Sequence, residues 1–98
     1  MKEDLLKIIN HYGITHQQRK LNEEVFELQE AITRYEDDYY YMCEPEGLDI
    51  AKEHITEELA DVMVLLNQIK YYYELDSERI EKIMKEKIAR QLERMKNE

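Results

Sequence analysis

Two pairs of carboxylates are the residues of this sequence best suited to chemistry. Glu24 and Glu27 stand in the stretch KLNEEVFELQEAI, and Glu58 and Asp61 stand in ITEELADVMVLL. Residues three positions apart lie on the same side of a helix, one turn apart, so the two members of each pair project together. Ligand sets made only of oxygen suit Mg²⁺, with Mn²⁺ as an alternative.

Each of these carboxylates is followed directly by an apolar residue. The four neighbours are Val25, Leu28, Leu59 and Val62. Each pair therefore flanks an apolar stripe, and packing of the two stripes would bring all the carboxylates together at the edge of the core. Negative charges clustered in such a place raise their own pKa values or recruit cations. The alternative is that both pairs belong to solvated helix faces.

A row of basic residues near the end of the sequence is a candidate for binding phosphate. Lys87, Arg90 and Arg94 follow one another at helical spacing beside an apolar stripe. The chain has a net charge of −9, so most of its surface would repel a substrate that carries phosphates. A basic ridge could neutralise these phosphates opposite a metal ion. The alternative is that these residues pair with acids on neighbouring helices and favour the C-terminal end of their own helix.

Four helices are predicted to position these residues, because apolar residues recur at helical spacing in four segments. The expected ranges are about 3–11, 15 to 35 or 37, 50–74, and 76 or 77 to 96. Gly13 ends the first helix, since glycine tolerates the left-handed conformation found at helix C-termini. Thr15 and Gln18 match a capping box that would open the second helix. Residues 38–49 hold the only proline and the second glycine, so they are predicted to form a loop.

The last three predicted helices each carry one apolar stripe that we expect to be buried. The stripe of the second helix is Leu21, Val25, Leu28 and Ile32; that of the third is Ile55, Leu59, Val62, Leu66, Ile69 and Tyr73; that of the fourth is Ile80, Met84, Ile88, Leu92 and Met95.

Length and composition indicate a single all-α domain over residues 1–98. The sequence has 2 Gly and 1 Pro, and 38% of its residues are charged, which is too few turn formers for a fold of many strands. A chain of this length buries only a modest core by itself. We therefore expect the core to be completed by oligomerisation.

The charge and the apolar pattern exclude several classes of partner. A strongly acidic surface repels nucleic acid and anionic lipid, so we expect neither as a ligand. No segment approaches the roughly 18 apolar residues of a membrane span, and the first residues lack the apolar region of a signal peptide. The single cysteine, Cys43, has no partner for an internal disulfide. A soluble cytoplasmic protein is the expectation.

The acidic patterns resemble those of the all-α nucleoside triphosphate pyrophosphohydrolases, the MazG-like superfamily. That family carries E-E-x-x-E on one helix and E-x-x-D on a later one, which stand here at residues 23–27 and 58–61. The surrounding KLNEEVFEL and EELADV, and the closing KIARQLERM, also look like the family. The resemblance covers roughly Gln17 to Arg94.

The resemblance implies a bundle of four to five helices, assembled as a homodimer or homotetramer. It implies a hydrolase acting on acid anhydrides, which cleaves a nucleoside triphosphate between the α and β phosphates to give a nucleoside monophosphate and pyrophosphate. The residues that match the Mg²⁺-binding positions are Glu24, Glu27, Glu58 and Asp61. Lys87 and Arg90 are then candidates for catalytic contacts to the phosphates, with Arg94 beside them.

Two further residues have possible roles in such a site. Glu23, or one of the metal ligands, could orient the attacking water. Gln17 lies seven residues before Glu24, on nearly the same helix face, and could donate a hydrogen bond to a base.

Two other readings stay open. The related phosphoribosyl-ATP pyrophosphohydrolases share similar acidic motifs. A helical module that senses nucleotides or binds proteins without catalysis would also carry acidic faces. The base preference is not predicted, because the 30 residues between Glu27 and Glu58 form a longer segment than is usual in the family.

Overall fold

The computed structural model describes residues 1–39 and 45–98, and the regular elements of these ranges are all helices. They are α1 (Lys2–Tyr12), α2 (Ile14–Asp37), α3 (Pro45–Tyr72) and α4 (Ser77–Lys96). The predicted all-α class is confirmed. Among the described residues, none of the helices has the length and apolarity that crossing a bilayer requires.

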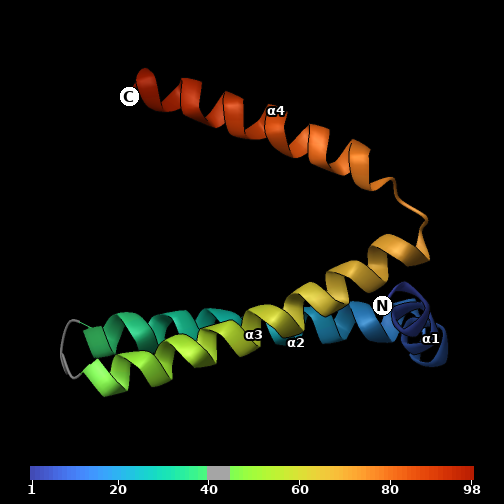
Figure 1. The fold of residues 1–98 in the computed structure, drawn as a ribbon, viewed down its shortest axis with the longest axis horizontal. Coiled ribbons are helices and arrows are strands. Elements are labelled where there is room, and N and C mark those ends of the chain that lie inside the picture. Colours follow the sequence, from blue (N-terminus) through green and yellow to red (C-terminus); the bar gives the residue numbers. More distant parts are fainter. Residues whose placement is uncertain (40–44) are drawn as a thin grey trace.

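The body of the molecule is the antiparallel pair of α2 and α3 (Figure 1). α1 packs against this pair at the end where α2 begins and α3 finishes (Figure 1). The buried apolar residues come from these three helices: Leu5, Ile9, Ala31, Ala51, Val62 and Leu65. This small core fixes α2 and α3, which carry the predicted carboxylates.

α1 and α2 meet at Gly13, which ends α1 as predicted. Its φ of 90° and ψ of 153° lie in a region that residues with a side chain rarely adopt. The Gly13 N–H donates to the Ile9 carbonyl at 2.7 Å, and the Gly13 carbonyl accepts from the Gln17 N–H at 3.1 Å. The glycine thus closes one helix and opens the next.

The capping box predicted for Thr15 and Gln18 is wrong. α2 begins at Ile14 with Gly13 as its N-cap, and no side chain caps it. Because the Gly13 carbonyl already closes the first turn, Thr15 lies inside the helix and has no cap position to fill.

The predicted loop is shorter than expected, because Pro45 begins α3 and does not interrupt a loop. Proline is favoured at the first helical position, where its missing N–H has no intrahelical partner to lose. Residues 45–49 therefore belong to α3. Residues 40–44, with two tyrosines of the predicted loop and Cys43, fall outside the described residues.

The predicted apolar stripes of α2 and α3 are buried only in part: Val62 is buried, and the half-buried members are Leu21, Val25, Leu28, Ile55 and Ile69. Ile32, Leu59 and Leu66 remain 43–50% exposed. The fully buried residues of the two helices are Gln17, Glu24 and Ala31 on α2, and Ala51, Val62, Leu65 and Gln68 on α3, and of these only Val62 belongs to a predicted stripe. Polar side chains therefore lie in the contact itself and not beside it.

α4 packs against none of the other described helices and projects away from the body (Figure 1). None of its residues is buried. The stripe predicted on α4 is present, but most of it is exposed to solvent: Met84, Ile88, Leu92 and Met95 are each more than half exposed. Within one chain, no other described helix covers this face of α4.

Local hydrogen bonds fix the turn between α3 and α4. The Leu75 N–H donates to the Lys70 carbonyl at 2.9 Å, and the Glu74 N–H donates to the Tyr71 carbonyl at 3.1 Å. These are the two bonds of a Schellman motif. The Asp76 carboxylate then caps α4 by accepting from the Glu78 N–H at 3.0 Å. The direction in which α4 leaves α3 is therefore set by the turn and not by side-chain packing.

Replacing Glu74 with glycine should stabilise the protein. Glu74 has a φ of 53°, which is costly for a residue with a side chain, whereas glycine adopts it freely. We expect Glu74→Gly to raise the free energy of unfolding by about 0.5–1 kcal/mol, measured by urea denaturation. Glu74→Ala is the matched control, because it keeps the strain and should change stability little. Equal effects of the two variants would contradict this account of the turn.

Candidate metal centre

Three of the four predicted carboxylates meet between α2 and α3. Glu24, Glu27 and Glu58 each place an oxygen within 4.8 Å of the other two. Two come from successive turns of α2, and the third comes from the facing side of α3. The convergence expected from the spacing of the acidic pairs is therefore present for these three residues.

Burial makes this cluster different from an ordinary acidic surface. Glu24 is only 7% exposed, and the side chain of Glu58 is 14% exposed. One oxygen of each, Glu24 Oε2 and Glu58 Oε2, is buried without a hydrogen-bond partner among the described residues. An unpartnered buried carboxylate oxygen is costly, and a bound cation is one of the few groups that can satisfy it.

The remaining oxygens of these two side chains have basic neighbours on their own helices. Lys20 Nζ lies 3.2 Å from Glu24 Oε1, and His54 Nε2 lies 3.3 Å from Glu58 Oε1. The pKa of Lys20 is raised, first by its hydrogen bond to Glu24 and then by the charge of that carboxylate. Each basic group therefore satisfies one oxygen and leaves the other facing the cluster.

Asp61 lies at the rim of the cluster and is exposed. Its pKa is raised by desolvation first, and then by the negative charges of Glu24 and Glu58. The pKa of Glu27 is raised first by the charge of Glu24, then by desolvation. The four predicted carboxylates thus affect one another electrostatically, although Asp61 is outside the tight group of three.

A cavity of about 310 Å³ adjoins the cluster. Its lining contains Glu24 and Asp61 together with residues of α1, α2 and α3: Ile8, Gln17, Lys20, Val64, Leu65 and Gln68. Carboxylates, an ammonium group and amides therefore face one space that also has apolar walls. Such a mixture suits a ligand with a charged end and a less polar end.

Gln17, predicted to contact a base, is buried and paired with a residue that sequence reasoning missed. The Gln17 Nε2 group donates to Gln68 Oε1 at 2.9 Å, and the two residues are 5% and 2% exposed. Gln68 follows Asp61 by seven positions, just as Gln17 precedes Glu24 by seven. In antiparallel helices these matching offsets lead to the same end of the site, and this was the signal available in the sequence.

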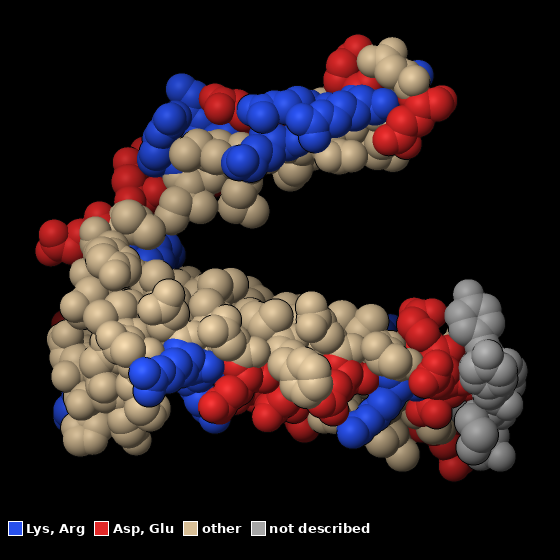
Figure 2. Space-filling model, turned by 180° about the vertical axis from the view of Figure 1, so that it is seen from behind, with Lys and Arg blue, Asp and Glu red and all other residues tan. Residues whose placement is uncertain are grey.

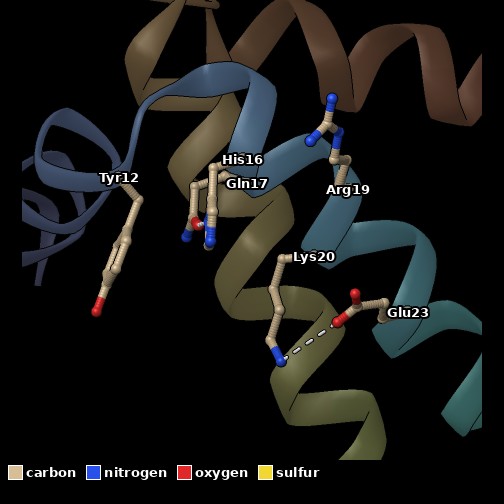
Figure 3. Close-up of a pocket in the computed structure, with 6 residues that line it drawn as sticks. All are labelled: Tyr12, His16, Gln17, Arg19, Lys20 and Glu23. Atoms are coloured by element: carbon tan, nitrogen blue, oxygen red, sulfur yellow. Dashed lines mark hydrogen bonds and ion pairs between the residues drawn. The ribbon is translucent and has the colours of Figure 1, made fainter.

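A second cavity, of about 420 Å³, lies on the same side of α2 (Figure 3). It is lined by Tyr12, His16, Gln17, Arg19, Lys20 and Glu23. The rings of Tyr12 and His16 are stacked with centroids 5.0 Å apart, and His16 Nδ1 lies 2.8 Å from Gln17 Oε1. Glu23 is exposed and lies 3.6 Å from Lys20 Nζ (Figure 3).

The basic ridge of Lys87, Arg90 and Arg94 lies on α4, and the chain does not bring it to the carboxylates. α4 makes no contact with α2 or α3 among the described residues, and neither cavity includes a residue of α4. Lys20, which was not predicted, is one of the two basic residues that do stand at the cluster, together with His54. Its spacing of four from Glu24 was the signal for it.

Comparison with known proteins adds no relative from which a function can be transferred. No family model, curated protein or solved structure matches this chain. The case for a function therefore depends on the geometry of the site.

Mg²⁺ should stabilise the protein, because a site preformed in the folded chain binds metal that the unfolded chain does not. At a concentration 100 times the Kd, the gain is about 2.7 kcal/mol, visible as a rise in Tm over the same protein in EDTA. Glu58→Gln should remove this rise. The same variant should melt higher than the wild type in EDTA, because one charge is gone from the cluster.

Glu57→Gln is the matched control, since Glu57 neighbours Glu58 but is absent from the cluster. It should keep the Mg²⁺-dependent rise in Tm. An equal rise in Glu58→Gln would remove that carboxylate from the metal site.

Proposed function

We propose that this protein is a Mg²⁺-dependent nucleoside triphosphate pyrophosphohydrolase that cleaves between the α and β phosphates. The observation that carries the proposal is the convergence of Glu24, Glu27 and Glu58, with two buried carboxylate oxygens that lack partners. The adjoining cavity gives such a cluster a place for a ligand. The activity fits a cytoplasmic protein, where nucleoside triphosphates are abundant.

The donor set fits Mg²⁺, with Mn²⁺ as the alternative, because all the ligands are carboxylates. Glu24, Glu27 and Glu58 would hold the ion, and Asp61 would complete the set from the rim. When bound, Mg²⁺ supplies charge neutralisation at phosphate oxygens and lowers the pKa of a coordinated water. The negative charge of these clustered carboxylates also favours the binding of a cation between α2 and α3.

Lys20 and Glu23 are two groups beside this set that could act on phosphate and water. Lys20 stays protonated at neutral pH, because its pKa is raised, and it lines the cavity beside Glu24. It is placed to pair with a phosphate oxygen. Glu23 is exposed at the mouth of the neighbouring cavity and can accept a proton from the attacking water.

Lys87, Arg90 and Arg94 remain proposed contacts to the leaving pyrophosphate. α4 lies apart from the body of its own chain. The charges of these three residues would therefore stabilise the pyrophosphate only if α4 approached a carboxylate cluster. We propose that the protein acts as a homodimer or homotetramer, in which α4 has a neighbour.

Gln17 and Gln68 are proposed to recognise the nucleoside. Their amides are buried beside the carboxylates, and both side chains line the cavity of about 310 Å³. Amide groups can donate to base carbonyls and accept from base amino groups. A nucleoside placed there would leave its phosphates directed towards Asp61 and Glu24.

Purified protein should convert nucleoside triphosphates to monophosphate and pyrophosphate only with Mg²⁺ or Mn²⁺. The panel should include ribo- and deoxynucleoside triphosphates and phosphoribosyl-ATP, with products resolved by ion-exchange chromatography. Glu58→Gln and Asp61→Asn should each lower kcat by at least about 100-fold, because they weaken charge stabilisation at the reacting phosphate. Glu57→Gln should retain full activity.

The products decide among the alternatives. Release of orthophosphate and a diphosphate would overturn the assignment to the α–β bond. Turnover of phosphoribosyl-ATP alone would shift the substrate class. Nucleotide binding without any product would indicate a sensor.

Replacing Gln68 alone, and then Gln17 and Gln68 together, should separate the structural role of this amide pair from its role in recognising the nucleoside. Gln68→Leu leaves the Gln17 amide without its buried partner, at a cost of about 1–3 kcal/mol in the free energy of unfolding. The double variant Gln17→Leu/Gln68→Leu removes both polar groups and should recover most of that stability. It should also raise KM for the preferred nucleotide by about tenfold, with kcat little changed. An unchanged KM in the stable double variant would make the pair purely structural.

A further inference from the structure

The chain exposes far more surface than a compact protein of its mass. Its accessible area is 8224 Å², whereas a folded monomer of 12.0 kDa exposes about 6,000 Å². Its radius of gyration is 17.2 Å, whereas about 13 Å is typical of this length. The excess of about 2,200 Å² is within the area that each subunit of an obligate dimer buries, roughly 1,000–2,500 Å².

Much of this surface is apolar and lies on two facing sides of an open gap. Figure 2 shows the gap between α4 and the body, with few charged side chains on the two sides that face each other. On α4 the apolar side is the α4 stripe: Met84, Ile88, Leu92 and Met95. On α3 exposed apolar residues recur at steps of four and three, and together with Tyr73 directly after the helix they form the α3 stripe: Leu59, Met63, Leu66 and Tyr73.

The charges of the two parts are opposite. α4 contains seven Lys or Arg and four Asp or Glu, a net charge of +3. The rest of the chain contains seven basic and nineteen acidic residues, a net charge of −12. Contact between α4 and the body of another copy therefore brings opposite charges together, although each whole chain is acidic.

The turn before α4 has its own hydrogen bonds at both helix ends. The Schellman bonds from Leu75 and Glu74, and the cap from Asp76, fix both helix ends within a few residues. These bonds are present with α4 standing away from the body (Figure 1). A second copy can fill the same gap while they stay intact.

We infer that the gap between α4 and α3 is the docking surface for a second copy of this chain, with the α4 stripe of each copy packed on the α3 stripe of the other. The contact is reciprocal, so two equivalent surfaces close on each other and no apolar stripe remains uncovered. The dimer requires neither bound metal nor turnover, so it stands or falls independently of the proposed activity.

Light scattering coupled to size exclusion, with small-angle X-ray scattering, tests this on the full chain. The wild type should show at least twice the 12.0 kDa chain mass at micromolar concentration. Ile88→Glu and Leu66→Glu should each weaken association at least 100-fold and give monomers. Ala89→Glu is the matched control, because it adds the same charge to α4 a quarter turn away from the stripe, and it should keep the wild-type mass.

Circular dichroism should show that the variants remain folded, since neither Ile88 nor Leu66 is buried within its own chain. A wild-type monomer at every concentration would overturn the inference, whether its radius of gyration is near 17 Å or near the 13 Å of a closed form. An oligomer that survives both stripe variants would overturn it as well, because its interface would lie elsewhere.

Discussion

The contact between α2 and α3 contains carboxylates at positions that are ordinarily aliphatic in a pair of packed helices. The rest of the site depends on how the repulsion between these carboxylates is balanced. Glu24 and Glu58 face each other across the contact and repel. Lys20 pairs with one oxygen of Glu24, and His54 contacts one oxygen of Glu58, each from the same helix and one turn away. Apolar packing on either side, including Val62 and Leu65, keeps the helices together despite the repulsion.

The rest of the site follows from this pair of helices. The seven-residue offsets along each helix bring Gln17 and Gln68 together beside the carboxylates, so an amide contact continues the polar row of the interface. α1 covers the end of the row, and its Ile8 contributes an apolar wall to the cavity. Gly13 makes this possible, because only its backbone geometry lets α1 turn sharply into α2. The cavity therefore needs three helices, although only two carry the acidic motifs.

Much of this arrangement could be predicted from the sequence, and the failures have physical causes. The helical class, the break at Gly13 and the convergence of Glu24, Glu27 and Glu58 follow from spacing and turn chemistry. The buried faces could not be found from apolar residues alone, because Ile32, Leu59 and Leu66 face outward while Glu24 and Gln68 face inward. Hydrophobic periodicity assumes that the most apolar side of a helix is its buried side. That assumption fails where a polar site occupies the contact and where another apolar side is left uncovered.

α4 also has a consequence for local stability. Its backbone hydrogen bonds are all within the helix or its caps, and no described helix packs against it. An isolated helix of about 20 residues is only marginally stable in water, so in a lone chain α4 would open at little cost while the body stays folded. Its amide hydrogens would then exchange quickly with solvent, and those of α2 and α3 slowly. Protection of the α4 amides from exchange would therefore report whether another copy of the chain covers α4.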